Sequence, residues 1–331
     1  MVKKIVAAAL ALAALAGAGC SKSSTVVENT SKEETVKVGI IQIVVHDALD
    51  ASRNGFLDAL KENGYEEGKN LEVDYKNAQD DKQMAQTIAT GFKNDKKDLI
   101  FAIATPSAQA AYNATKEIPI VITAVTDPVD AGIAQSMEKS GTNVTGTSDD
   151  VPIAPQLDLI KKVLPDAKTV GVIYNTSEPN SVLQVRRLKD AAAKVGLAVE
   201  EVGVTNVNEV NQVLPVLLAK IDVLYVPTDN TVASAYALVN KLALDSKVPV
   251  FSAEEAGVTS GSLMSAGIDY YQLGKEAGLK AVEVLKGAKP SDVPITTIAE
   301  PTIAVNTKTA AALGITIPED ILGTAVKIGG N

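Results

Sequence analysis

The chain has 331 residues, of which 46% are apolar and 21% charged, with 23 Gly and 14 Pro, a composition typical of a globular protein of about two domains. The formal net charge of −9 leaves no basic footprint, which argues against a nucleic-acid partner. One Cys, one His and no Trp exclude a disulfide framework and a Cys/His zinc site built from this chain alone, so only carboxylates remain as metal ligands.

The N-terminus has the pattern of an export signal. Lys3 and Lys4 supply a positive start, and residues 5–15 form an apolar stretch that is too short to span a bilayer. Residues 16–20 follow as a run of small side chains, which is typical of a cleavage region. We therefore expect the segment to be removed on export.

The only cysteine ends that run of small residues, and this arrangement resembles a bacterial lipobox. The resemblance implies a signal peptide at 1–19 and lipidation of Cys20. Gly17 departs from the aliphatic residue usual at its position, and a plain secretory signal is the alternative. Residues 20–35 then form a polar tether. The folded part is expected outside the cytoplasm, lipid-anchored to the cell membrane.

The body of the chain alternates between the two hydrophobic periods. Continuous or alternating β-branched and apolar runs predict strands at 36–45, 71–75, 99–103 and 118–122. Helical spacing of apolar residues predicts helices at 48–60, 84–92 and 107–115. Strands alternating with helices indicate a parallel sheet covered on both faces.

The second half of the chain repeats this order. The segments 38–41, 98–102 and 117–120 have counterparts of similar sequence at 170–173, 222–226 and 247–250. The spacing between counterparts differs only by amounts that loops absorb. The predicted fold class is therefore α/β, with two doubly wound parallel-sheet lobes.

Open parallel sheets bind ligands beyond the carboxyl ends of their strands, where the crossover direction switches. The loops at those ends are richer in polar residues than the strands that they follow, and they span 45–50, 104–109, 125–128, 174–181, 227–231 and 253–255. If the two lobes face each other, all six loops converge on one cleft, which is the architecture of a clamshell binder.

Five segments carry a resemblance to a known family, namely 103–109, 124–129, 143–149, 225–230 and 267–271. Together they resemble the ABC-transporter substrate-binding lipoproteins of the tryptophan/tyrosine-binding type, over roughly residues 36–322. The resemblance implies a type I periplasmic-binding fold with a multi-strand hinge, capture of a small solute and its delivery to ABC permease subunits. It favours an aromatic amino acid as the ligand, a monomer and no cofactor.

The expected lobe boundaries follow from this fold. Lobe one comprises 36–146 plus about 268–298, and lobe two comprises 147–267 plus about 299–331. Thr147 and Asp269 lie at the first two predicted crossings between lobes and are candidate ligand contacts. Glycines beside them supply the tolerant backbone that a hinge needs.

The Thr105-Pro106-Ser107 sequence ends a strand and opens a helix. Pro suits the first helical turn, and Thr or Ser can cap it. The free N–H groups of that turn attract an anion, so Thr105, Ser107 and Ala108 are candidates to bind a ligand carboxylate. The alternative is an ordinary N-cap.

An amino-acid ligand also needs a carboxylate partner for its ammonium, because a desolvated unpaired cation is costly. Asp229 is the first candidate, and Asp127 and Glu254 are the next. Each could instead be an exposed loop carboxylate.

The first loop of the second lobe and the first loop of the first lobe supply the remaining candidates. Asn175, Glu178, Asn180 and Ser181 can hydrogen-bond the ligand or the opposing lobe, or form an Asx-type turn with a helix cap. The other candidates could contact the ligand through apolar or aromatic side chains, and they are His46, Leu49 and Tyr174. The alternative is that these side chains pack in a core or are exposed to solvent.

Competing functions are less well supported by the residues. The chain has no G-x-G-x-x-G after the first strand and no G-x-x-x-x-G-K-[ST] loop, which disfavours nucleotide chemistry, and no catalytic residue is assigned. A sugar or purine ligand, and a role as a ligand sensor or adhesin with the same fold, stay open as alternatives.

Overall fold

The structure is a computed structural model that describes residues 35–298 and 301–329. The predicted signal peptide, Cys20 and the tether up to Glu34 lie outside the described residues. Within the two described ranges, no helix combines the length and the apolar character needed to cross a membrane.

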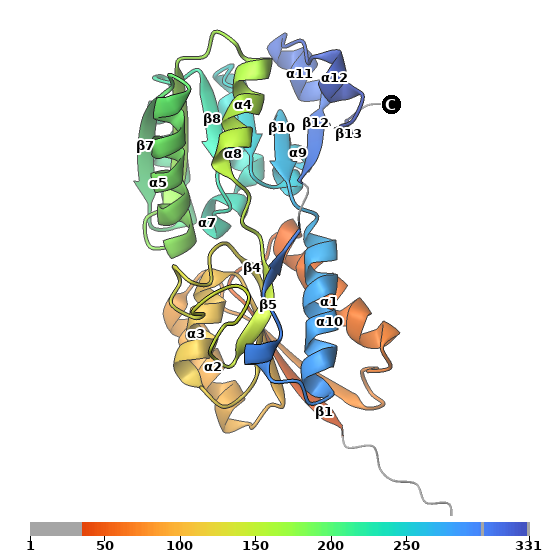
Figure 1. Cartoon of the computed structure of the whole chain (residues 1–331). Helices are drawn as coiled ribbons and strands as arrows, with labels where there is room; N and C mark the ends of the chain where they lie inside the picture. The colour runs from red at the N-terminus through yellow and green to blue at the C-terminus, as the bar shows by residue number, and fades with distance from the viewer. Residues whose placement is uncertain (1–34, 299–300, 330–331) are drawn as a thin grey trace, which may run out of the picture. The chain divides into compact units, whose positions relative to one another are not determined.

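The first sheet, sheet A, has the strand order β11-β5-β4-β3-β1-β2, and its neighbouring strands are parallel. Its strands are β1 (Val36–Gln42), β2 (Leu71–Asn77), β3 (Leu99–Ile103), β4 (Ile120–Val125), β5 (Val144–Ser148) and β11 (Thr296–Thr297). Helices α1 (Asp47–Glu62) and α10 (Tyr270–Leu285) cover one face, and α2 (Lys82–Asn94) and α3 (Thr105–Ala114) cover the other (Figure 1). We call this unit lobe one.

The core of lobe one lies between sheet A and its helices. The five residues of β3 are all fully buried, as expected for a strand covered on both faces. The rings of Phe56 and Phe101 stack with centroids 3.7 Å apart. Helices α1 and α10 meet at backbone distance, since a Cβ built on Gly274 would lie 1.9 Å from the Ser52 carbonyl oxygen. Only glycine permits so close an approach.

The second sheet, sheet B, has the order β13-β12-β10-β9-β8-β6-β7, and only the β10–β12 pair is antiparallel. Its strands are β6 (Thr169–Asn175), β7 (Ala198–Val204), β8 (Val223–Val226), β9 (Val250–Ser252), β10 (Met264–Gly267), β12 (Thr302–Asn306) and β13 (Val326–Ile328). We call sheet B and its helices lobe two.

The helices of lobe two lie on both faces of sheet B. Helix α4 (Ile153–Val163) packs beside α5 (Pro179–Lys194), and α6 (Val207–Leu218) packs beside α8 (Tyr236–Asp245) (Figure 1). The shorter helices are α7 (Asn230–Ala233), α9 (Glu255–Thr259), α11 (Thr307–Leu313) and α12 (Glu319–Leu322). A 3-10 turn, η1 (Pro290–Asp292), follows α10.

The predicted α/β class with two doubly wound lobes is confirmed. In each sheet the chain moves first to one side and then to the other, so the switch points lie between β1 and β3 and between β6 and β8. The chain leaves lobe one after Ser148, returns between β10 and α10, and enters sheet B again between β11 and β12.

Several predicted boundaries were wrong by one to three residues. The first strand ends at Gln42 rather than at residue 45, because its β-branched run continues past the last paired residue. The helix expected at 107 begins at Thr105. The strand expected at 118–122 spans Ile120–Val125, because Pro119 has no N–H to donate and pairing starts after it.

Candidate functional site

The loops at the carboxyl ends of the two sheets meet. The Nε2 atom of His46, after β1, lies 3.5 Å from Oδ1 of Asn230, after β8. The Thr126 and Thr228 hydroxyls lie 3.2 Å apart, and the Thr231 hydroxyl lies 2.6 Å from Oδ2 of Asp80. Three of the six loops predicted to converge, 45–50, 125–128 and 227–231, therefore meet between the lobes.

An arginine of lobe two strengthens this contact. Arg187, on α5, donates to Oδ2 of Asp127 and to Oδ1 of Asp150, both at 2.8 Å. Asp127 follows β4 in lobe one, and its Oδ1 also accepts the N–H groups of Val129 and Asp130. The side chain of this predicted ammonium partner is thus committed to a turn and to an ion pair between the lobes.

A group of buried polar atoms marks the centre of the cleft. Among the described residues, nine buried side-chain polar atoms lack a hydrogen-bond partner within the protein. Seven of these nine belong to segments that follow a strand of either sheet, namely His46 Nδ1, Thr105 Oγ1, Ser107 Oγ, Asp149 Oδ1, Asn180 Oδ1, Tyr236 OH and Glu254 Oε2. A buried polar atom without a partner costs about 1–3 kcal/mol, so this group is suited to binding a polar ligand.

The wall from lobe one presents hydroxyl groups. The N-cap of α3 is Ala104, at φ 77°, and it makes no side-chain capping bond. The expectation that Thr105 or Ser107 caps this helix was therefore wrong, because both lie inside its first turn together with Pro106. The two hydroxyls and the free N–H groups of the first turn are uncharged donors at the N-terminus of a ten-residue helix. Such a helix end attracts anions. Ala108 is buried in that turn.

The histidine at this wall is neutral. Burial lowers the pKa of His46 to about 4. Asn230 donates its amide N–H to the carboxyl of Glu178, which turns its Oδ1 toward His46. The imidazole Nε2 then carries the proton, and Nδ1 is left as an acceptor without a protein partner.

The wall from lobe two presents carboxyl groups. Asp229 is fully buried and caps α7, since Oδ1 accepts the Val232 N–H at 2.8 Å and Oδ2 accepts the Asn175 N–H at 2.5 Å. Glu178 accepts the N–H groups of Asn230 and Thr231. Burial, then the nearby Asp229 charge, raises the pKa of Glu178 to about 8, and burial raises that of Asp229.

Two further carboxyls are less well satisfied. Burial, followed by the charges of Asp149, Asp229 and Glu178, raises the pKa of Glu254 well above its usual range. Asp149 accepts the Tyr270 hydroxyl at 2.8 Å through Oδ2, whereas Oδ1 has no protein partner. Burial raises the pKa of Asp149 to about 6.

Sequence reasoning missed Asp149 and Tyr236 as cleft residues. Asp149 was placed at the first crossing without a ligand role, although a carboxyl directly after a strand of the sheet is a detectable signal. Tyr236 starts α8, and nothing in its local sequence separates it from a core tyrosine.

Other predicted site residues lie away from the unpartnered group. Leu49 is in the core of lobe one, and the Thr147 hydroxyl contacts Thr123 Oγ1 and the Leu273 carbonyl there. Tyr174 packs against the core of lobe two, where Glu201 and Lys189 act on its hydroxyl. Asn175 and Ser181 support the site from within, since Asn175 donates to the Thr231 hydroxyl and Ser181 to Asp229.

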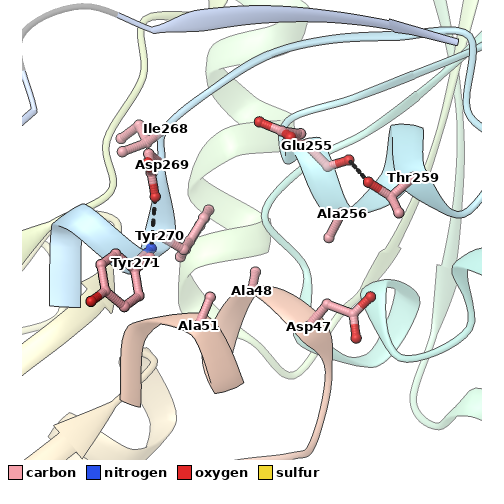
Figure 2. A pocket seen from close by; sticks show the side chains of 10 residues that line it. All are labelled: Asp47, Ala48, Ala51, Glu255, Ala256, Thr259, Ile268, Asp269, Tyr270 and Tyr271. Atoms are coloured by element: carbon pink, nitrogen blue, oxygen red, sulfur yellow. Dashed lines mark hydrogen bonds between the residues drawn. The ribbon is translucent and has the colours of Figure 1, made fainter. Parts of the chain in front are cut away.

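Two cavities lie beside the cleft. The first, of about 260 Å³, is lined by the start of α1, by α9 and by residues 268–271 of the second crossing, where Asp269 caps α10 (Figure 2). The second, of about 270 Å³, includes His46 and Tyr236 in its wall, so it reaches two of the unpartnered side chains. No three His, Cys, Asp or Glu side chains in the described ranges converge on a metal position.

Comparisons with known proteins agree with this geometry. Residues 37–328 match the family model described as ABC transporter substrate binding protein. Over 312 residues, 93% of this chain and 90% of the relative, the sequence is 48% identical to a tyrosine-binding protein of Clostridioides difficile. Two solved structures are also similar and differ in how well they superpose.

One is described as an ABC domain in complex with L-Trp from Streptococcus pneumonia; it is 39% identical, with a TM-score of 0.86, over 89% of this chain and all of that chain. The other is a ligand-free, open structure of a substrate binding protein with adhesive properties from Clostridium difficile, 50% identical over 90% of this chain and all of that chain. Its TM-score is only 0.68. A lower TM-score despite the higher identity is expected if the two lobes are each conserved but are closed in this protein and open in that structure. The chain belongs to the family of ABC transporter substrate-binding proteins.

Proposed function

We propose that the protein captures an aromatic amino acid between its lobes, outside the cytoplasm, and delivers it to the permease subunits of an ABC importer. One observation carries the proposal: seven buried polar atoms without protein partners are contributed by both lobes to one cleft. A small polar ligand would satisfy them and would stabilise the closed arrangement, because it binds that arrangement better than the open one.

The relatives support an aromatic amino acid as the ligand. One relative, 48% identical, is named a tyrosine-binding protein, and another, 39% identical, was solved with L-Trp. The single His and the tyrosines at the cleft, among them Tyr236 and Tyr270, are compatible with an aromatic side chain. A sugar or purine is the less favoured alternative.

The ligand carboxylate is proposed to bind at the start of α3. Thr105 and Ser107 carry hydroxyl groups there without protein partners, and the helix N-terminus adds free N–H groups and a favourable dipole. Asn180 and His46 are proposed to contact the ligand through their unpartnered Oδ1 and Nδ1 atoms.

The proposal includes a lipid anchor on Cys20 after removal of residues 1–19. The tether to residue 35 then lets a monomer reach the permease from the membrane surface. We assign the protein no catalytic residue, metal or cofactor, because binding and release complete its role.

Thermal unfolding of the chain from Ser21 tests this function, after co-purified ligand has been stripped off. A ligand that binds only the native state raises Tm with its concentration. We expect L-Tyr, L-Trp or L-Phe to raise Tm within a panel of twenty amino acids, common sugars and purines. A shift with a sugar or purine alone, or no shift at all, contradicts the aromatic amino-acid proposal.

Adhesion is a second candidate function, since a relative 50% identical is described as having adhesive properties. Purified chain from Ser21 should then compete with intact cells for a host surface. A matched amount of denatured chain is the control, and equal adhesion with both would contradict this second function.

A further inference from the structure

Four carboxyl groups are buried in the segments that follow strands β5, β6, β8 and β9. Asp149, Glu178, Asp229 and Glu254 are each at most 4% exposed. They act on one another electrostatically, since the charges of Asp149, Asp229 and Glu178 all oppose ionisation of Glu254. Such a group is unfavourable without protons or a cation, because burying an unpaired charge costs several kcal/mol.

The four carboxyls differ in what the protein gives them. Asp229 accepts two backbone N–H groups and Glu178 accepts two, and these donors offset part of the effect of burial, which raises the pKa of both. Glu254 Oε2 and Asp149 Oδ1 have no partner. The unmet demand for positive charge is therefore concentrated on Glu254 and Asp149.

The charged and titratable side chains that face these two carboxyls do not meet that demand. Asp149 faces Tyr270 and Asp150, and Glu254 faces Asp149, Asp229 and Glu178. Arg187 is bound to Asp150 and Asp127, and His46 is neutral. In the ligand-free protein protonation relieves these carboxyls, and a cation that ionises them would have to come from a ligand.

The unpartnered atoms also fit one kind of cation. An ammonium group has three N–H donors. Three atoms without protein partners belong to Glu254 and to two groups that interact with it: Glu254 Oε2, Asp149 Oδ1 and the hydroxyl of Tyr236, whose pKa the nearby Glu254 charge helps to raise.

We propose that Asp149 and Glu254, with the Tyr236 hydroxyl, bind the α-ammonium of the ligand, in place of the predicted Asp229. This inference rests on the proposed function, since it assumes an amino acid as the ligand. Asp149 directly follows β5 at the first crossing, whereas Glu254 follows β9 in lobe two. Ammonium binding thus joins the first crossing to lobe two.

The test compares a ligand with its analogue that lacks the amine. Calorimetry measures Kd for L-Tyr and for 3-(4-hydroxyphenyl)propanoate, using the chain from Ser21. We expect Glu254→Gln and Asp149→Asn each to raise Kd for L-Tyr roughly 10- to 100-fold, because a charge-assisted hydrogen bond is lost. Kd for the amine-free analogue should change less than about threefold, or fall, because its binding needs no carboxylate.

Two controls separate this role from a structural one. Glu201→Gln removes the same charge from an exposed pair with Lys189 in lobe two, and it should leave both Kd values unchanged. Asp229→Asn replaces one of the two oxygens that accept backbone N–H groups with an NH2 donor, so it should lower Tm and weaken both ligands equally. In contrast, Glu254→Gln and Asp149→Asn should keep or raise the Tm of the ligand-free protein, since each removes a buried charge.

Three results would overturn the inference while the proposed function stands, provided that the unmodified chain binds L-Tyr. The first is a Kd for L-Tyr that stays within threefold of the original in both Glu254→Gln and Asp149→Asn. The second is an equal loss of affinity for L-Tyr and for the amine-free analogue. The third is a lower Tm of the ligand-free variants. If the unmodified chain binds neither L-Tyr nor L-Trp, the proposed function itself is wrong.

Discussion

Lobe one and lobe two share a fold but present opposite chemistry to the cleft. The wall of lobe one has hydroxyls and the N-terminus of α3, which suit a negative group, and a neutral imidazole, which adds no charge. The wall of lobe two carries buried carboxyls, which suit a positive group. Two similar doubly wound lobes thus form complementary halves of a site for a zwitterion.

This difference also fixes the direction of the ligand. In the proposed binding mode the ligand carboxylate faces α3 and the ammonium faces Glu254 and Asp149, so the side chain extends away from both. The cavity of about 270 Å³ whose wall includes His46 and Tyr236 is the adjoining space. Substitutions in each wall, and changes of pH, test this contrast between the lobes.

The largest effect is expected from removing the anion-binding character of lobe one. Thr105→Val combined with Ser107→Ala removes two hydroxyls that have no protein partner. We expect Kd for L-Tyr to rise at least tenfold, because two hydrogen bonds to a carboxylate are lost. Calorimetry measures the change.

The control ligand is tyramine, which keeps the amine of L-Tyr and has no carboxylate. Its Kd should therefore be the same for the original chain and the double variant. If the double variant binds L-Tyr as tightly as the original chain, the wall of lobe one does not bind the ligand carboxylate, and the proposed contrast between the two walls is wrong. The Tm of the ligand-free protein should not fall, since neither hydroxyl bonds within the protein.

An intermediate effect is expected from pH, through the carboxyls beside the proposed ammonium. Burial raises the pKa of Asp149 to about 6 in the ligand-free protein, and a bound ammonium would lower it. Binding therefore releases protons, and Kd for L-Tyr should rise about tenfold from pH 7 to pH 5. Calorimetry in buffers of different ionisation enthalpy measures the protons released, and uptake of protons would contradict the expectation.

The stability of the ligand-free protein should change with pH in the opposite direction. The folded pKa of Asp149 is raised above the unfolded value of 3.8, so the folded state binds the proton more tightly. Ionisation of buried Asp149 therefore lowers the free energy of unfolding by about 3 kcal/mol above pH 6. This loss of stability disappears as pH falls toward 4. Asp149→Asn should remove this part of the pH dependence of Tm.

The smallest effect is expected from the ion pair that joins the lobes. Arg187→Gln removes the bonds to Asp127 and Asp150, and the three side chains are 25–35% exposed, so solvent screens the pair. We expect dissociation of L-Tyr to become two- to fivefold faster, measured by stopped flow, with less dependence on salt. Arg186→Gln, in an exposed pair with Asp130, is the control and should change nothing.

The fold was predictable because its signals are local. The β-branched run at 99–103 and the helical spacing at 48–60 reappear as β3 and α1, and the repeated segments indicated two lobes. The loops at the cleft followed from topology alone, since the carboxyl ends of parallel strands meet at one edge.

The individual roles within the cleft were less predictable. Asp229 and Glu254 look alike in sequence, because each is a carboxyl directly after a strand of lobe two. Only the three-dimensional structure distinguishes Asp229, with two backbone donors, from Glu254, whose Oε2 has no partner. Hydrogen bonding from distant segments decides which carboxyl is available, and no local pattern encodes it.

The close packing of α1 on α10 fixes α10 to the rest of lobe one. A Cβ on Gly55 would lie 2.0 Å from the Tyr271 carbonyl oxygen, just as one on Gly274 would meet Ser52, so the two backbones interlock. Sliding one helix along the other would drive side chains into the neighbouring backbone. Sliding of α10 over α1 is therefore blocked within lobe one, so α10 travels as a rigid part of lobe one in any rotation of the lobes about the crossings.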